Sequence, residues 1–231
     1  MPHSQRPTDQ TLGMFAKVPR PGQVKTRLAV TLGDNTAAHV YGLFLRQLLA
    51  RLTPLRYCKS LVHWPAGEGD YFSDFAEHGW RVEPQSPGDL GTRMGNFFQL
   101  RFAAEDRQVV LIGSDSPDLP LEMIESAFSH LERTEVVLGP SHDGGYYLIG
   151  MSKFHLEIFQ DMPWSTSEVL AETVARLQRG GTSHVLLDPW YDVDDGADLE
   201  DLLTRLTHDS VQCPELQALR EELIRSLAAR Q

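Results

Sequence analysis

Short apolar runs alternate with longer stretches of helical periodicity up to about residue 140 of the chain. Five runs have the length and the β-branched or apolar character of strands: TLGMFA, CKSLVHW, WRVEPQ, QVVLIG and EVVLGP. After the first, apolar residues recur at steps of three and four behind Asp34, which we expect to cap a helix. The stretch 89–104 repeats this form. Alternating strands and helices predict a mostly parallel sheet covered by helices on both faces.

The pattern changes in the second half of the chain. GYYLIGM follows EVVLGPSHDG after a few turn residues, which indicates a hairpin or an added antiparallel strand. Beyond it we expect a helix over 167–179, a strand at SHVLLD, a helix over 197–206 and a charged amphipathic helix over about 214–231. The predicted fold class is therefore α/β, with three layers and a mixed, mostly parallel sheet.

Composition indicates an ordinary globular chain. Of its 231 residues 41% are hydrophobic and 23% charged, and no repeat or long polar linker marks a second domain. We expect one domain over 11–231 behind a disordered segment 1–10. Cys58 and Cys213 have no disulfide or metal-site spacing, which favours a reducing compartment. With no signal peptide pattern and no long apolar run, the expected location is the cytoplasm, away from membranes.

The net charge narrows the choice of ligand. The chain carries 21 Lys and Arg against 32 Asp and Glu, a net charge of −11. Nucleic acid binding relies on basic residues that release the counterions of the phosphate backbone, so this balance disfavours it. A small-molecule ligand is the better expectation.

The loop after the first predicted strand is locally basic. No acid occurs over 10–33, whereas four cations stand there: Lys17, Arg20, Lys25 and Arg27. Beside a helix N-terminus such a group predicts phosphate binding, and the alternative is a solvated basic loop. A Walker A loop would require glycines where Pro19 and Val24 stand. The place of the loop, behind a strand of a parallel sheet, favours the ligand interpretation.

Two acidic segments are candidates for a metal site. Asp115 follows the strand QVVLIG among small neighbours, so its carboxylate could bind Mg²⁺ or Mn²⁺ together with nucleotide phosphates, whereas Asp118 is expected to cap the next helix. Asp192 and Asp194 alternate around Val193, which places both on one side at a strand end, and one of them is the candidate second ligand. Three nearby acids are expected in the first turn of a helix, where the helix dipole stabilises negative charge: Asp198, Glu200 and Asp201.

The turn GPSHDGGYY lies between two predicted strands. Gly144 and Gly145 either supply positive φ or admit a ligand close to the backbone. The Asp143 carboxylate and the tyrosine rings suit acceptor hydroxyls. A hydrolase is disfavoured, because no GxSxG elbow is present. Trp164 precedes a helix start that local capping explains, with substrate contact as the alternative.

Six segments in order resemble the successive motifs of one family: FAKVPRPGQVKTRLA, GDLGTRMG, GSDSPDLP, GPSHDGGYYLIG, PWSTSEVLAET and WYDVDDGADLEDL. This is the radical-SAM/selenodomain-associated transferase family, described as glycosyltransferase-like, within the nucleotide-diphospho-sugar transferase superfamily of glycosyltransferase A type fold. The resemblance covers about Gly13 to Leu203. The opening is also similar to phospholactate guanylyltransferases, which carry a K-T-R-L stretch in the nucleotide-binding loop.

The resemblance implies roles for individual residues. It implies phosphate binding at Lys17, Lys25 and Arg27 in a loop that also holds Gly22 and Thr26, a metal on Asp115, and a second ligand at Asp192 or Asp194. GDLGTRMG falls where the superfamily reads base and ribose, and the candidates there are Gln85, Asp89 and Arg93. The sequence departs from related nucleotidyltransferases in two places, because it lacks their GGxGTR loop and replaces T-P-E of their DVDTPEDL segment with Asp195-Gly196-Ala197.

The leading expectation is a transferase that uses Mg²⁺ or Mn²⁺ and a nucleotide-activated donor, most simply a nucleotide sugar, to modify a small acceptor. Lys25, Asp115 and Asp143 are the expected catalytic residues, with Asp143 placed to orient or deprotonate the acceptor hydroxyl. The expected substrate contacts are Gly144, Gly145, Tyr146 and Trp164. Nucleotidyl transfer with release of pyrophosphate and a non-catalytic nucleotide-binding module are the alternatives. Sheet edges and the terminal helix permit a homodimer.

Overall fold

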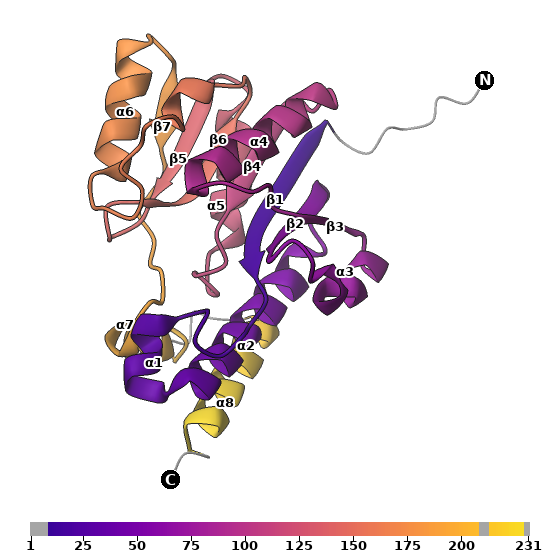
Figure 1. The fold of residues 1–231 in the computed structure, drawn as a ribbon, viewed down its shortest axis with the longest axis vertical. Helices are drawn as coiled ribbons and strands as arrows, with labels where there is room; N and C mark the ends of the chain where they lie inside the picture. Colours follow the sequence, from indigo (N-terminus) through magenta and orange to yellow (C-terminus); the bar gives the residue numbers. More distant parts are fainter. Residues whose placement is uncertain (1–8, 208–212, 229–231) are drawn as a thin grey trace, which may run out of the picture.

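The computed structural model describes residues 9–207 and 213–228, which form a sheet packed between helices (Figure 1). The sheet has seven strands in the order β3-β2-β1-β4-β6-β5-β7. Their bounds are β1 (Gln10–Lys17), β2 (Cys58–Trp64), β3 (Trp80–Pro84), β4 (Gln108–Ile112), β5 (Val136–Pro140), β6 (Tyr146–Met151) and β7 (His184–Leu186). Only β6 runs antiparallel to its neighbours within this described sheet, which confirms the predicted mixed sheet. The predicted N-terminal segment lies outside the described residues except for its end, where β1 already begins at Gln10.

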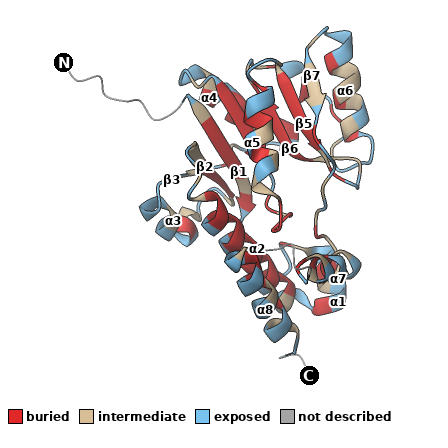
Figure 2. Cartoon of the chain, turned by 180° about the vertical axis from the view of Figure 1, so that it is seen from behind, coloured by how far each residue is buried: buried red, intermediate tan, exposed pale blue. Residues whose placement is uncertain are grey.

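Helices cover both faces of the sheet. In the described chain they are α1 (Thr26–Leu32), α2 (Asp34–Leu52), α3 (Ser73–Glu77), α4 (Leu90–Ala103), α5 (Leu121–His130), α6 (Val169–Arg179), α7 (Gly196–Arg205) and α8 (Pro214–Ala228), with 3₁₀ turns η1 (Gly69–Phe72) and η2 (Leu156–Ile158). Strand β4 shows why there are three layers. Its side chains alternate, so Val110 and Ile112 pack with α2 and α5, whereas Val109 and Leu111 pack with α4 and α6. Both faces are accordingly buried (Figure 2).

Helix α2 belongs to two cores at once. One side packs on the sheet through residues such as Leu45 and Leu48. The other side, through Val40 and Phe44, packs against α1, α7 and α8. Full burial of each such side chain contributes about 1.5–3 kcal/mol. This second core holds the segment before α7 next to α1. Lys25 and Asp194 are therefore neighbours although they are 169 positions apart in the sequence.

Four helix starts test the predicted caps. Asp89 caps α4 as expected, accepting a hydrogen bond from the Thr92 amide at 2.8 Å. The Asp34 prediction is wrong by one residue, because Gly33 is the N-cap of α2 and Asp34 lies in its first turn. The Asp118 prediction is also wrong. The helix α5 starts only at Leu121, behind Pro120, and the Asp118 carboxylate instead accepts a 2.7 Å hydrogen bond from Arg205. The cap predicted directly behind Trp164 is wrong too, because α6 starts only at Val169 and has no side-chain cap.

The topology gathers several loops at one edge of the sheet. Strands β1 to β4 are parallel, so their carboxyl ends meet there, and the β5–β6 turn joins them because β6 starts at the same edge. An isolated bridge between Ser141 and Trp190 fixes the segment behind β7 beside that turn. In the part of the chain that the structure covers, no helix combines the length and the apolar character that a membrane crossing needs.

Candidate functional site

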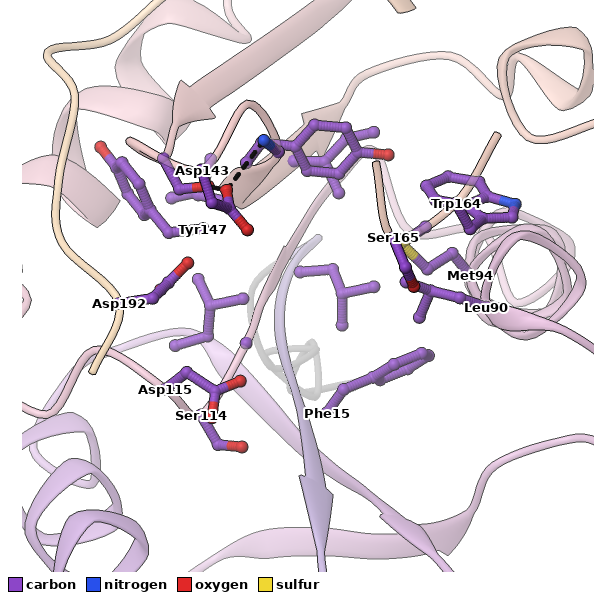
Figure 3. Close-up of a pocket in the computed structure, with 18 of the residues that line it drawn as sticks. Phe15, Leu90, Met94, Ser114, Asp115, Asp143, Tyr147, Trp164, Ser165 and Asp192 are labelled. Atoms are coloured by element: carbon purple, nitrogen blue, oxygen red, sulfur yellow. Dashed lines mark hydrogen bonds between the residues drawn. The ribbon is translucent and has the colours of Figure 1, made fainter. Parts of the chain in front are cut away.

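A cavity of about 520 Å³ opens at this edge of the sheet (Figure 3). Its volume is typical of small-molecule sites. Eleven of the predicted site residues line it: Lys17, Lys25, Gln85, Arg93, Asp115, Asp143, Gly145, Tyr146, Trp164, Asp192 and Asp194. Five others do not: Gly22, Thr26, Arg27, Asp89 and Gly144. The remaining cation of the basic loop, Arg20, pairs with Glu68 at 2.8 Å.

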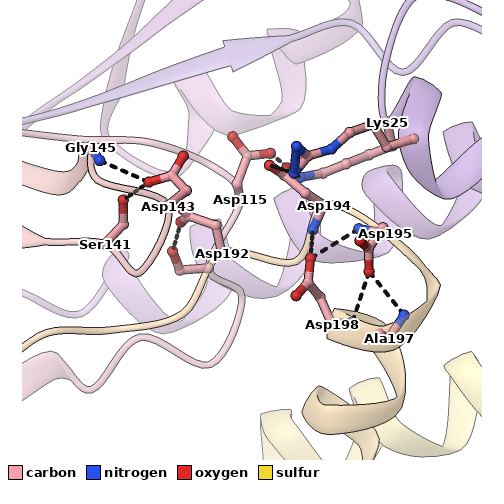
Figure 4. A network of polar contacts seen from close by, with 12 residues as sticks. Lys25, Asp115, Ser141, Asp143, Gly145, Asp192, Asp194, Asp195, Ala197 and Asp198 are labelled. Carbon is pink, nitrogen blue, oxygen red and sulfur yellow. Dashed lines mark hydrogen bonds and ion pairs between the residues drawn. The ribbon is translucent and has the colours of Figure 1, made fainter. Parts of the chain in front are cut away.

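Lys25 joins two carboxylates of the polar network, Asp115 and Asp194 (Figure 4). It is the N-cap of α1, in the left-handed backbone conformation with φ 48° and ψ 46°. Its ammonium contacts the Asp115 carboxylate and lies 3.1 Å from Asp194 Oδ1, and only 4% of the side chain is exposed. Burial alone would lower the pKa of Lys25, but the two carboxylates outweigh it and raise the pKa above its usual value. Lys25 is therefore charged at neutral pH.

The segment before α7 brings Asp194 to this network. Val193 is fully buried, and its amide donates to the Asp115 carbonyl at 2.9 Å. The neighbouring acids Asp192 and Asp194 both line the cavity, as the alternation predicted, but on an extended segment beyond β7 rather than on a regular strand. The amide of Asp194 donates to the Asp198 carboxylate at 2.9 Å, which ties the segment to the start of α7. Asp194 Oδ2 also accepts a 2.9 Å hydrogen bond from Arg27.

Asp192 has a different environment. Its Oδ1 accepts a 2.6 Å hydrogen bond from the Ser116 hydroxyl. Burial raises the pKa of Asp192 to about 6 in spite of that bond, and the carboxylates of Asp115 and Asp143 act in the same direction. Asp192 is thus a carboxyl that can exchange a proton near neutral pH.

Asp143 is fixed within the β5–β6 turn. Its Oδ1 accepts a 2.9 Å hydrogen bond from the Gly145 amide and contacts the Ser141 hydroxyl. Gly144 has φ 90°, and a Cβ added there would lie 2.2 Å from the Ser167 carbonyl oxygen. The positive φ and the tight packing explain Gly144, whereas Gly145 faces the cavity. The turn therefore presents a carboxylate on a constrained backbone.

Gln85 and Arg93 form another part of the wall. The Gln85 amide donates to the Val62 carbonyl at 3.1 Å, and its Oε1 accepts from Arg93 at 3.4 Å. The Arg93 guanidinium lies 4.1 Å from the centre of the Trp64 ring, a cation–π contact. Both side chains are thus positioned in advance of any ligand. Asp89 is exposed, and hydrogen bonds from the Thr92 side chain and then from the Thr92 amide lower its pKa.

Sequence reasoning missed several residues of the site. An apolar wall consists of Phe15, Leu90 and Met94, with Trp164 packed against α4 at Gly91. Tyr41 is fully buried. Its hydroxyl accepts the Lys17 amide at 3.0 Å and pairs with Ser114 at 2.7 Å, which joins the ends of β1 and β4. Arg51 donates to the carbonyls of Pro117 and Leu119, both at 2.9 Å, and so holds the loop after Asp115.

The donor set can be compared with what a divalent metal requires. Among the described residues no three His, Cys, Asp or Glu side chains are grouped to share a metal ion, so Asp115, Asp192 and Asp194 do not form one three-ligand set. Asp115 and Asp194 nevertheless hold a cation between them, the ammonium of Lys25. Mg²⁺ commonly takes one or two protein carboxylates and completes its shell with substrate phosphates. Two carboxylates in a cavity of small-molecule size fit such an ion.

The sheet order and the cavity at its carboxyl edge define the nucleotide-diphospho-sugar transferase fold. The chain belongs to the family described as "uncharacterized protein conserved in bacteria (DUF2064)", whose model matches residues 50–166. The closer link to the radical-SAM/selenodomain-associated family stays a prediction.

Solved structures agree with the assignment of the fold. The chain is 32% identical to a candidate nucleotide-diphospho-sugar transferase from Desulfovibrio desulfuricans G20, with a TM-score of 0.86 and coverage of 96% and 98% of the two chains. The inositol-1-phosphate CTP transferase from T. maritima is 14% identical, with a TM-score of 0.52 and coverage of 95% and 97%. The 4-diphosphocytidyl-2C-methyl-D-erythritol synthase from Anaerococcus prevotii DSM 20548 is 10% identical, with a TM-score of 0.55 and coverage of 87% and 100%. These last two show the fold alone. No protein of curated function matches this chain in sequence.

Proposed function

We propose that this protein is a metal-dependent transferase that takes a nucleotide-activated donor, a nucleotide sugar, and delivers the glycosyl group to a hydroxyl of a small acceptor. The observation that carries the proposal is the cavity, which combines a buried lysine between two carboxylates with two further carboxylates that form no ion pair with another described residue. The name of the 32% identical relative agrees with a nucleotide-sugar donor.

The basic loop would bind the donor diphosphate. Lys25 and Lys17 both line the cavity and can donate charge-assisted hydrogen bonds to phosphate oxygens. Gln85 and Arg93 stand on the wall where the nucleoside would lie. Asp115, with Asp194 or Asp192, would hold Mg²⁺ or Mn²⁺, which when bound supplies charge neutralisation for the leaving diphosphate.

The Asp143 turn would receive the acceptor. A backbone amide and a serine hydroxyl fix the carboxylate, so it can accept a hydrogen bond from an acceptor hydroxyl in a defined direction. Removal of the hydroxyl proton as the new bond forms is the general-base role proposed for Asp143. Gly145, Tyr146 and Trp164 line the same cavity and would contact the acceptor or the sugar.

Nucleotidyl transfer is the second candidate. The cations Lys25 and Arg27, which both hydrogen-bond to Asp194, favour it, because a triphosphate carries more negative charge than the diphosphate of a nucleotide sugar. Released pyrophosphate would identify this reaction, and a released nucleoside diphosphate would identify glycosyl transfer. A non-catalytic nucleotide-binding module would bind without turnover.

Thermal unfolding against a panel of nucleotide sugars and nucleoside triphosphates, each with and without Mg²⁺ or Mn²⁺, tests the proposal without knowledge of the acceptor. A ligand at 100 times its Kd adds about 2.7 kcal/mol, which raises the Tm by about 5–10 °C for a chain of this size. We expect a metal-dependent shift with one nucleotide sugar. A shift confined to a triphosphate would favour nucleotidyl transfer, and the absence of any nucleotide shift would contradict all three functions.

A further inference from the structure

The two carboxylates best placed to bind a metal are already engaged by cations of the chain itself. Lys25 contacts Asp115 Oδ1 and Asp194 Oδ1, and Arg27 takes Asp194 Oδ2 at 2.9 Å. The Lys25 side chain is 4% exposed, whereas the Asp115 and Asp194 side chains are 45% and 35% exposed. The ammonium is therefore enclosed behind two carboxylates that face the cavity.

A divalent ion and this ammonium exclude one another. Mg²⁺ binds oxygen ligands at about 2.0–2.1 Å and demands a nearly ideal octahedron of them. An ion on the same Oδ1 atoms would occupy the position of Nζ and repel its charge. If Lys25 left without a new partner, it would be a buried unpaired cation, which is strongly unfavourable. The free protein thus resists metal binding at Asp115 and Asp194.

Nucleotide phosphates offer the missing partner. Lys25 lines the cavity in which the proposed function places the diphosphate, and phosphate oxygens accept the same hydrogen bonds as the carboxylates do. A phosphate that takes over Lys25 releases Asp115 and one oxygen of Asp194. The released carboxylates and the phosphate are together the ligands that Mg²⁺ prefers.

We propose that Lys25 is a built-in counter-ion that makes metal binding depend on nucleotide binding. Divalent metal is excluded from the Asp115–Asp194 pair until phosphates take over Lys25. The inference rests on the proposed function, since it requires a phosphate-bearing ligand in this cavity. Because coupling between two ligands is reciprocal, the metal strengthens nucleotide binding by the same factor.

Binding of Mn²⁺ alone, followed by the electron paramagnetic resonance signal of free Mn²⁺, tests the exclusion. We expect Lys25→Met to bind Mn²⁺ at least tenfold more tightly than the wild-type protein, and Asp115→Asn in the Lys25→Met background to abolish the gain. Lys17→Met is the matched control, because Lys17 lines the same cavity without an ion pair to either carboxylate, and it should bind Mn²⁺ as the wild type does. Equal affinity in wild type and Lys25→Met would overturn the inference.

A second variant covers the case in which Lys25→Met does not fold. Arg27 is 66% exposed, so Arg27→Gln should fold, and it frees Asp194 Oδ2. We expect an increase of about threefold in Mn²⁺ affinity, and no increase would overturn the inference. A wild-type protein that binds Mn²⁺ tightly through Asp115 without nucleotide would also overturn it while leaving the proposed function intact. A protein that never binds Mn²⁺, even with nucleotide, would contradict the metal dependence of the proposed function itself.

Discussion

The four acids that line the cavity fall into two pairs with different partners. Asp115 and Asp194 are bound by cations, the ammonium of Lys25 and the guanidinium of Arg27. Asp143 and Asp192 are bound by serine hydroxyls, with a backbone amide added for Asp143. The first pair is therefore charge-balanced in the free protein, and the second pair is not.

This difference separates two kinds of chemistry within one cavity. Carboxylates with cation partners can pass from one cation to another. A carboxyl without one is harder to ionise in a partly buried place, and the pKa of Asp192, about 6, shows the effect. Asp192 and Asp194 are only two residues apart, yet they belong to different pairs, because the chain between them is anchored by the buried Val193. The two-residue step thus places one carboxylate beside cations and the other beside a serine hydroxyl.

The largest effect is expected for the cation-bound pair. Asp115→Asn removes a proposed metal ligand and one of the two carboxylate partners of Lys25, so turnover should fall by about a thousandfold, equivalent to several kcal/mol of transition-state stabilisation. The steady-state rate with the donor found in the thermal panel, at saturating metal, measures it. Far-UV circular dichroism should show an intact fold. Full activity with unchanged metal dependence would remove Asp115 from the mechanism.

A smaller kinetic effect is expected for the hydroxyl-bound pair. Asp143→Asn keeps an oxygen for the Gly145 amide but cannot accept a proton, so kcat should fall by about a hundredfold while the affinity for metal and donor is unchanged. Rates at varied donor concentration, with Mn²⁺ titrations, distinguish the two variants. If Asp143→Asn lost metal binding instead, the division between the two pairs would be wrong.

Much of the fold was predictable because its signals are local. Apolar runs placed five strands, and the short turn before GYYLIGM indicated the antiparallel strand that became β6. The failures occur where a contact with a distant part of the chain decides the structure. Asp118 sits near a helix start in sequence, but Pro120 delays the helix, and Arg205 from α7 takes the carboxylate. No property of the residues near Asp118 indicates a partner 87 positions away.

The pairing within the site was beyond sequence reasoning for the same reason. Lys25 and Arg27 were predicted to bind phosphate, and Asp115 and Asp194 to bind metal, each from its own segment. That they bind one another depends on the packing of α7 against α1, which no local pattern encodes. Tyr41 was missed because it lies in the apolar stripe of α2, where the sequence predicts a tyrosine to be a core residue.

The stability of the folded protein should depend on pH through Asp192, which belongs to the hydroxyl-bound pair. Asp192 has a pKa of about 6 in the folded protein against about 3.9 in the unfolded chain. Well below pH 4 the group is neutral in both states and does not change the unfolding free energy. As the pH rises from about 4 through 6, the unfolded chain ionises this carboxyl more readily than the folded protein does, so the wild type should lose on the order of 2 kcal/mol of stability relative to Asp192→Asn.

Urea unfolding of both proteins at pH 4.5, 6 and 8, followed by tryptophan fluorescence, measures this difference. The Asn side chain keeps an oxygen for the Ser116 hydroxyl, so the comparison isolates the charge. Asp201→Asn, an exposed acid on α7, controls for the loss of one negative charge. A gap in unfolding free energy between wild type and Asp192→Asn that stays constant across pH would mean that burial does not raise the pKa of Asp192.

The smallest effect is expected for an acid that belongs to neither pair. Asp89 was predicted to bind nucleotide, but it lies outside the cavity lining and caps α4 through the Thr92 amide. Asp89→Ala should therefore lower the Tm by about 2–4 °C through loss of the cap. Its nucleotide-induced Tm shift should equal that of the wild type. Arg93→Ala, four residues on and facing the cavity, is the matched comparison and should reduce that shift. If Asp89→Ala reduced the nucleotide shift as much as Arg93→Ala, Asp89 would act on the ligand, and the α4 cap would have to be counted as part of the site.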